Sequence, residues 1–78
     1  MKTMTCRELG GACDEVFRAE TFDEMAELSK QHGMKMHAAA DADHLKAMQA
    51  MSELMQDSDA MNRWFEERRA AFEALPDA

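Results

Sequence analysis

The sequence predicts a small α+β fold, in which a short β-hairpin packs against about three α-helices. Two short segments with β-branched and aromatic residues lie on either side of a Gly-Gly pair, which is typical of a hairpin. Apolar residues then recur at helical spacing through three later stretches, each preceded by a capping residue. A chain of 78 residues has room for one hydrophobic core, so we treat residues 1–78 as a single domain.

The two strands of the hairpin are expected at residues 2–6 and 15–19. The Gly-Gly pair lies between them, and glycine is favoured where the chain turns tightly. Both cysteines of the chain, Cys6 and Cys13, fall at or near the turn end of the hairpin. The hairpin therefore brings two thiols toward one point.

The first helix is expected to begin at Thr21, which forms a Thr-x-x-Glu capping box with Glu24. One face of this helix carries residues at helical spacing: Phe22, Met25, Leu28, Ser29, His32 and Met36. Gly33 lies late in the helix and can loosen or end it. Because this face must pack against the hairpin, it directs His32 toward the two thiols.

Asp41 or Asp43 caps a second helix, which runs to about Gln56. Its inward stripe consists of His44, Met48, Met51 and Met55. We interpret the methionines as core, because methionine fills irregular cores well. The alternatives are a copper(I) site, since thioethers favour that ion, and a flexible surface that binds a protein partner.

Residues 56–59 form a turn, and Ser58 or Asp59 caps a third helix that ends before the single proline. One side of this helix carries large apolar residues and the packed stem of an arginine: Met61, Trp64, Phe65, Arg68, Phe72 and Leu75. The domain thus divides into a hairpin–helix metal-binding core at residues 1–40 and a two-helix C-terminal extension at residues 41–78.

The charge of the chain disfavours several classes of partner. The net charge is −7 and the isoelectric point is near 4.8, so we expect neither nucleic acid nor anionic lipid as a partner. No apolar run approaches the ~20 residues that span a bilayer, and no apolar stretch follows the N-terminal lysine as it would in a secretory signal. We therefore expect a cytoplasmic protein, in which paired cysteines more often bind metal or act in catalysis than form disulfides.

Four candidate metal ligands occur in the pattern Cys-x6-Cys-x18-His-x4-His: Cys6, Cys13, His32 and His37. Thiolates and imidazoles together suit Zn²⁺, which takes four such ligands in a tetrahedral structural site. The cysteines are further apart than in compact zinc-finger signatures. A zinc-finger-like core of a hairpin followed by a helix nevertheless accounts for the spacing, because the turn returns the second cysteine toward the first.

The run TCRELGGACDEVFRAETFDEMAELSKQHG resembles the bacterial predicted small metal-binding proteins, a family filed as a domain of unknown function (number ten fifty-nine). The shared pattern is a Cys, a Leu-Gly turn, a second Cys, a Thr-x-x-Glu helix start and a late His. The resemblance covers residues 1 to about 40 strongly. It is looser beyond them, where longer members share a Met-rich second helix and a Trp-containing third. It implies a zinc-type site with Cys6, Cys13 and His32, and no characterised activity.

The fourth ligand is His37 or His44. In a regular helix His32 and His37 point ~140° apart, so His37 joins the site only where a π-type turn widens the helix near Gly33. His44 already lies on the inward face of the second helix. Many short members of the resembled family share the His-x4-His spacing, and on that basis we predict His37.

We therefore expect a small zinc-binding protein in which Zn²⁺ ties the hairpin to the first helix, as a structural or protein-interaction module. We expect no enzyme, because the sequence holds neither a phosphate-binding glycine loop nor a nucleophile arrangement. The alternatives are an exchangeable zinc buffer or donor, a Cys6–Cys13 thiol redox switch without metal, and two inert buried cysteines.

Overall fold

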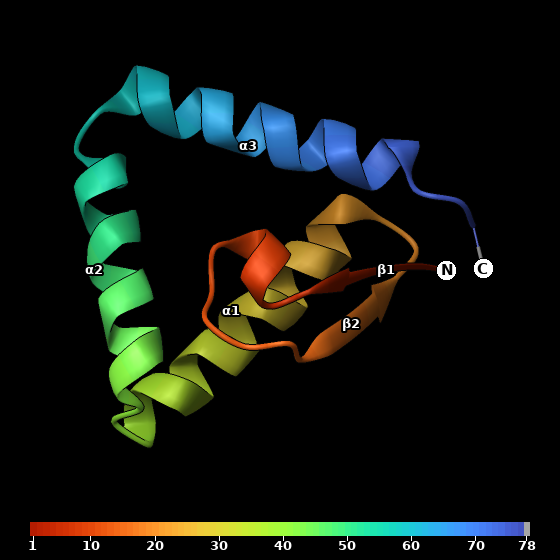
Figure 1. The fold of residues 1–78 in the computed structure, drawn as a ribbon. Helices are drawn as coiled ribbons and strands as arrows, with labels where there is room; N and C mark the ends of the chain where they lie inside the picture. The colour runs from red at the N-terminus through yellow and green to blue at the C-terminus, as the bar shows by residue number, and fades with distance from the viewer. Residues whose placement is uncertain (78) are drawn as a thin grey trace.

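The computed structural model describes residues 1–77 and shows a two-stranded antiparallel hairpin packed against three helices (Figure 1). The predicted α+β fold is confirmed. The elements in chain order are β1 (Lys2–Thr5), η1 (Arg7–Leu9), β2 (Val16–Ala19), α1 (Phe22–Ala38), α2 (Ala42–Met55) and α3 (Ser58–Ala74), where η1 is a single 3₁₀ turn.

The hairpin has one buried face and one exposed face, as alternation along a strand requires. β1 and β2 pair in a register that sets Met4 opposite Phe17. These two side chains and that of Ala19 are buried, whereas Val16 and Arg18 are exposed. The connection between the strands is a ten-residue loop that contains η1, and both cysteines lie in this loop.

Local hydrogen bonds fix where the first two long helices begin. The Thr21 hydroxyl accepts a hydrogen bond from the backbone N–H of Glu24 at 3.1 Å, as the capping box predicts. Of the two candidates for the second cap, Asp41 fills the position, and its carboxylate accepts the N–H of His44 at 3.0 Å.

The third helix is capped by Asp57, and the two predicted caps, Ser58 and Asp59, lie in its first turn. Asp57 Oδ1 accepts the backbone N–H groups of Asp59 and Ala60 at 3.0 and 3.2 Å. α2 ends at Met55, so the connection to α3 is only two residues long. The aspartate that directly precedes the helix is therefore the one in reach of its first free N–H groups.

The three helices outline a flat triangle. α3 (blue) runs along one side, α2 (green) along the second and α1 along the third, with the hairpin and η1 against α1 (Figure 1). The molecule measures 33 × 29 × 15 Å along its principal axes. α2 follows α1 at one corner of the triangle, and α3 follows α2 at the next.

The apolar core lies where the hairpin, the start of α1 and the end of α3 meet. Its members are Met4, Cys6, Leu9, Phe17, Ala19, Phe22, Met25 and Phe72. α2 contributes none of them, and its predicted methionine stripe is half-buried at best, with Met55 59% exposed. The buried residue of α2 is His44, which is also the one buried polar side chain among residues 1–77.

Among residues 1–77, no helix combines the length and the apolar composition needed to span a bilayer.

Candidate metal centre

Four side chains from four parts of the fold meet at one point: Cys6, Cys13, His32 and His44. Cys6 directly precedes η1, Cys13 lies in the loop before β2, His32 comes from α1, and His44 comes from the first turn of α2. Their sulfur and ring-nitrogen atoms all lie within 4.8 Å of one another. This Cys2His2 cluster links the hairpin to two helices and could hold a metal ion.

Two sulfur–nitrogen distances inside the cluster fit a tetrahedral metal shell. Cys6 Sγ lies 3.6 Å from His44 Nε2, and Cys13 Sγ lies 3.3 Å from His32 Nε2. In a zinc tetrahedron, Zn–S and Zn–N bonds of about 2.3 and 2.0 Å set sulfur and nitrogen roughly 3.6 Å apart. Both distances lie close to that value, so these two donor pairs are spaced as a tetrahedral metal site requires.

Backbone hydrogen bonds inside the loop bring the two cysteines together. The Arg7 N–H donates to the Cys13 carbonyl at 2.9 Å, and the Gly11 N–H donates to the Cys6 carbonyl at 2.8 Å. The Arg7 guanidinium also binds the Asp14 carboxylate, with Nε and Oδ1 3.2 Å apart. Both cysteines are free thiols, Cys6 buried and Cys13 half-buried.

Gly11 is required by the position of the Cys6 sulfur. A Cβ atom at residue 11 would lie 2.1 Å from Cys6 Sγ and 2.9 Å from the Cys6 carbonyl oxygen. Both distances are well inside van der Waals contact, so any side chain here would displace the thiol. The Gly-Gly pair thus does more than turn the chain, because its second member makes room for a member of the cluster.

The two histidine rings are held by packing as well as by the thiols. The rings of His32 and His44 meet edge to face with their centroids 5.3 Å apart. The ring of Phe17, on the buried face of the hairpin, contacts His32 in the same manner at 5.5 Å. These contacts restrict both imidazoles before any metal binds.

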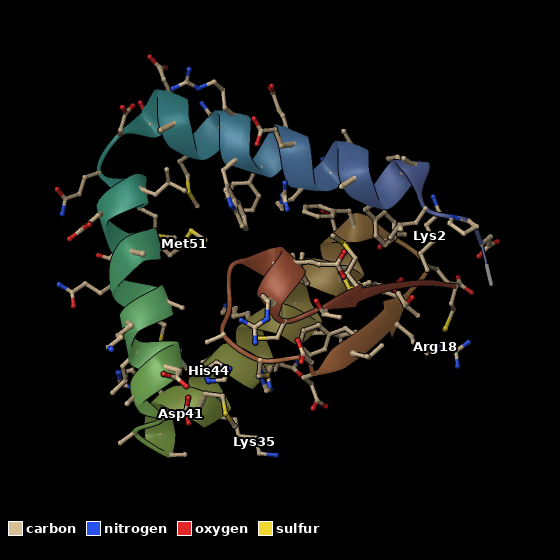
Figure 2. All side chains as sticks on the ribbon, viewed as in Figure 1. Lys2, Arg18, Lys35, Asp41, His44 and Met51 are labelled. Carbon is tan, nitrogen blue, oxygen red and sulfur yellow. The ribbon has the colours of Figure 1, made fainter. Side chains whose placement is uncertain are left out.

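Asp41 orients the His44 ring. Asp41 Oδ2 lies 2.5 Å from His44 Nδ1 and also accepts the backbone N–H of His44 (Figure 2). This hydrogen bond is the main cause of two pKa shifts. It raises the pKa of His44, although burial acts in the opposite direction, and it lowers the pKa of Asp41. In the neutral ring, the Nδ1 proton donates to the Asp41 carboxylate, and the lone pair of Nε2 then faces the cluster.

The structure differs from the prediction at the fourth position. It brings Cys6, Cys13 and His32 together as expected, but His37 is exposed and lies outside the cluster. The physical reason is helical phase: α1 is a regular α-helix from Phe22 to Ala38, with no π-type turn at Gly33, so His32 and His37 face different ways. His44, the other candidate, takes the place.

One signal in the sequence marks His44. An aspartate at the cap and a histidine three residues later place a carboxylate beside an imidazole in the first turn of α2. Asp41 or Asp43 was expected only as a helix cap, and the structure gives Asp41 a second role as the partner of the His44 ring.

Comparisons with known proteins add no relative. No family model, no curated protein and no solved structure matches this chain. The case for a metal centre therefore rests on the geometry of these four side chains.

Proposed function

We propose that this protein binds one Zn²⁺ ion through Cys6, Cys13, His32 and His44, and that the metal ties the hairpin to α1 and α2. The observation that carries the proposal is the pair of sulfur–nitrogen distances, 3.6 and 3.3 Å, in a group whose four donor atoms lie within 4.8 Å of one another.

Zinc is the ion that this donor set favours. Two thiolates and two imidazoles are the usual ligands of four-coordinate structural zinc, whereas magnesium and calcium prefer oxygen donors. Four protein ligands fill a tetrahedral shell, so we propose a structural or protein-interaction role and no enzymatic one. A small chain gains most from such a site, because the binding free energy of structural zinc, on the order of 10 kcal/mol, adds to folding.

Metal analysis of the protein purified without an affinity tag tests the proposal. We expect about one equivalent of zinc that survives dialysis, as structural sites retain their metal. Metal-free protein with two titratable thiols and an unchanged circular dichroism spectrum would overturn it.

A matched pair of histidine variants tests which residues form the site. We expect His44→Ala to lower zinc affinity by more than the roughly 10–100-fold typical of losing an outer hydrogen-bond partner, because it removes a ligand. His37→Ala should leave the affinity unchanged, since His37 is exposed and outside the cluster. The opposite result would show that α1 rearranges on metal binding and that His37 is the fourth ligand.

A thiol redox switch is the second candidate, because Cys6 and Cys13 are free and their sulfur atoms lie within 4.8 Å of each other. In that case mild oxidation would join them in a disulfide after a small movement of the loop. The two functions separate on one measurement. Zinc-loaded protein should resist disulfide formation by mild oxidants, whereas a metal-independent switch should oxidise at the same rate with and without zinc.

A further inference from the structure

A cavity of about 120 Å³ lies beside the cluster, between η1, α1 and α2. Cys6, His32 and His44 line it, whereas Cys13 does not. Cys6 and His44 are buried, but most of the other lining residues are half-buried. The cavity therefore leads from the surface to the buried half of the cluster.

Small residues form part of the wall of this cavity. All three glycines of the chain, Gly10, Gly11 and Gly33, line it, and Ala47 lines it from α2. A water molecule needs at least about 10–15 Å³ of such space, so the cavity has room for a molecule of several heavy atoms.

Gly33 is not explained by packing. A Cβ atom at this position would lie 3.6 Å from the Met48 methyl group, which is ordinary van der Waals contact. Glycine inside a helix is destabilising by roughly 0.5–1 kcal/mol relative to alanine. The chain thus has glycine where the more stabilising alanine would fit, and the missing methyl group makes the cavity wider.

The chemistry of the walls indicates what would enter. The thioethers of Met48 and Met51 line the cavity, and Figure 2 shows Met51 on the side of α2 that faces η1. Among the described residues that line it there is no lysine or arginine, and the chain carries a net charge of −7. Polarisable walls that hold no lysine or arginine favour small neutral molecules with a soft donor atom over anions.

We infer that this cavity is a binding site for small neutral thiols and is the route by which they reach Cys6. The inference rests on the proposed function in one respect, because a thiol that arrives here can exchange with a metal ligand. In that exchange the incoming sulfur forms a bond to the metal while the bond to the Cys6 sulfur breaks. The proton of the incoming thiol passes to the released Cys6 sulfur, so charge balances and no oxidant takes part.

The exchange is tested on zinc-loaded protein with neutral 2-mercaptoethanol as the probe and a chromophoric zinc chelator in excess. We expect the rate of zinc transfer to the chelator to rise in proportion to the thiol concentration. Anionic 2-mercaptoethanesulfonate, at the same concentration of protonated thiol, should accelerate transfer several-fold less. A transfer rate that does not depend on the concentration of 2-mercaptoethanol would overturn the inference.

Two alanines of α2 supply a matched pair of variants. Ala47 lines the cavity, whereas Ala50 is exposed on the same helix. We expect Ala47→Leu to fill the cavity and slow the thiol-dependent transfer roughly tenfold, and Ala50→Leu to leave it unchanged. Equal slowing in both variants, or none in Ala47→Leu, would contradict the assignment.

A second variant guards against an overpacked Ala47→Leu that does not fold. Gly33→Ala adds one methyl group at ordinary contact distance and removes a helix-interior glycine, so it should fold at least as well as the parent chain. We expect it to slow the thiol-dependent transfer by about two- to threefold, a smaller effect than that of leucine because less volume is filled. An unchanged rate in this variant would also count against the cavity as the route.

Failure of the proposed function gives a different result from failure of this inference. If the purified protein binds no zinc, the cavity is tested in the same folded protein with methyl methanethiosulfonate, a small neutral reagent that modifies thiols. Ala47→Leu should slow the modification of Cys6 and leave that of Cys13 unchanged, because only Cys6 lines the cavity. Equal rates for Cys6 in the parent chain and the variant would overturn the inference alone.

Discussion

The two C-terminal helices are attached to the rest of the molecule by different chemistry. α3 places Phe72, 1% exposed, in the apolar core, where its ring meets that of Phe22 with the centroids 5.9 Å apart. α2 buries a single residue, His44, whose close polar contacts include the Cys6 thiol and the Asp41 carboxylate. Apolar burial needs no cofactor, whereas a thiol–imidazole contact contributes little until a metal joins it. If the cluster holds the proposed metal, we therefore expect the position of α2 to depend on the state of the cluster far more than that of α3.

Metal removal should have the largest effect and should fall unequally on the two helices. Chelation with EDTA removes a binding free energy on the order of 10 kcal/mol, shared with folding. We expect hydrogen exchange, followed by mass spectrometry, to speed up first in α2 and in the loop that carries the cysteines. The C-terminal half of α3 should keep more protection, because Phe72 stays in the core. Equal loss of protection in both helices would show that the cluster holds the whole fold.

Phe72→Ala should produce the next largest effect, and it should weaken the attachment of α3 to the apolar core. Truncation of a buried phenylalanine destabilises a protein by about 3–5 kcal/mol. Phe65→Ala is the matched control on the same helix, because Phe65 is 40% exposed. Urea unfolding of the zinc-loaded protein measures both variants. If the two variants lost equal stability, the apolar core would not be what holds α3.

The sequence predicts most local parts of this fold, and the cap of α3 is the exception. Thr21 and Asp41 cap their helices through hydrogen bonds to residues three positions later, so the chain segment itself contains the information. The hairpin is equally local, since its strands pair around one loop. The sequence also predicts the proximity of Cys6, Cys13 and His32, because the hairpin and the following helix are adjacent in sequence.

The fourth member of the cluster and the cavity depend on non-local packing. The fourth member of the cluster depends on where α2 crosses the end of α1. The spacing of residues in the sequence does not predict that crossing, so it could not decide between His37 and His44. Helical phase already counted against His37. The cavity is formed by glycines from the loop and from α1 together with Ala47 from α2, so it exists only once these segments meet.

Asp41→Asn should weaken metal binding while the helix cap is retained. Asparagine caps helices about as well as aspartate, but it does not supply the negative charge that supports a metal-bound imidazole. We expect zinc affinity, measured by competition with a chelator of known affinity, to fall about 10–100-fold. Asp57→Asn is the matched control, because Asp57 caps α3 and does not belong to the cluster. An equal loss of affinity in both variants would assign the effect to helix stability and not to the His44 ring.

The smallest expected effect comes from the cap of α3, which belongs to the part of the molecule that does not depend on the cluster. Asp57 Oδ1 accepts two backbone N–H groups, so Asp57→Ala should lower the free energy of unfolding by about 1 kcal/mol. Zinc affinity should not change, because the residue is not in the cluster. Ser58→Ala should have less effect on stability, since Asp57 and not Ser58 caps this helix. A larger loss of stability in Ser58→Ala than in Asp57→Ala would show that Ser58 is the cap, as the sequence alone suggested. A loss of zinc affinity in Asp57→Ala would show that α3 and the cluster are coupled through α2.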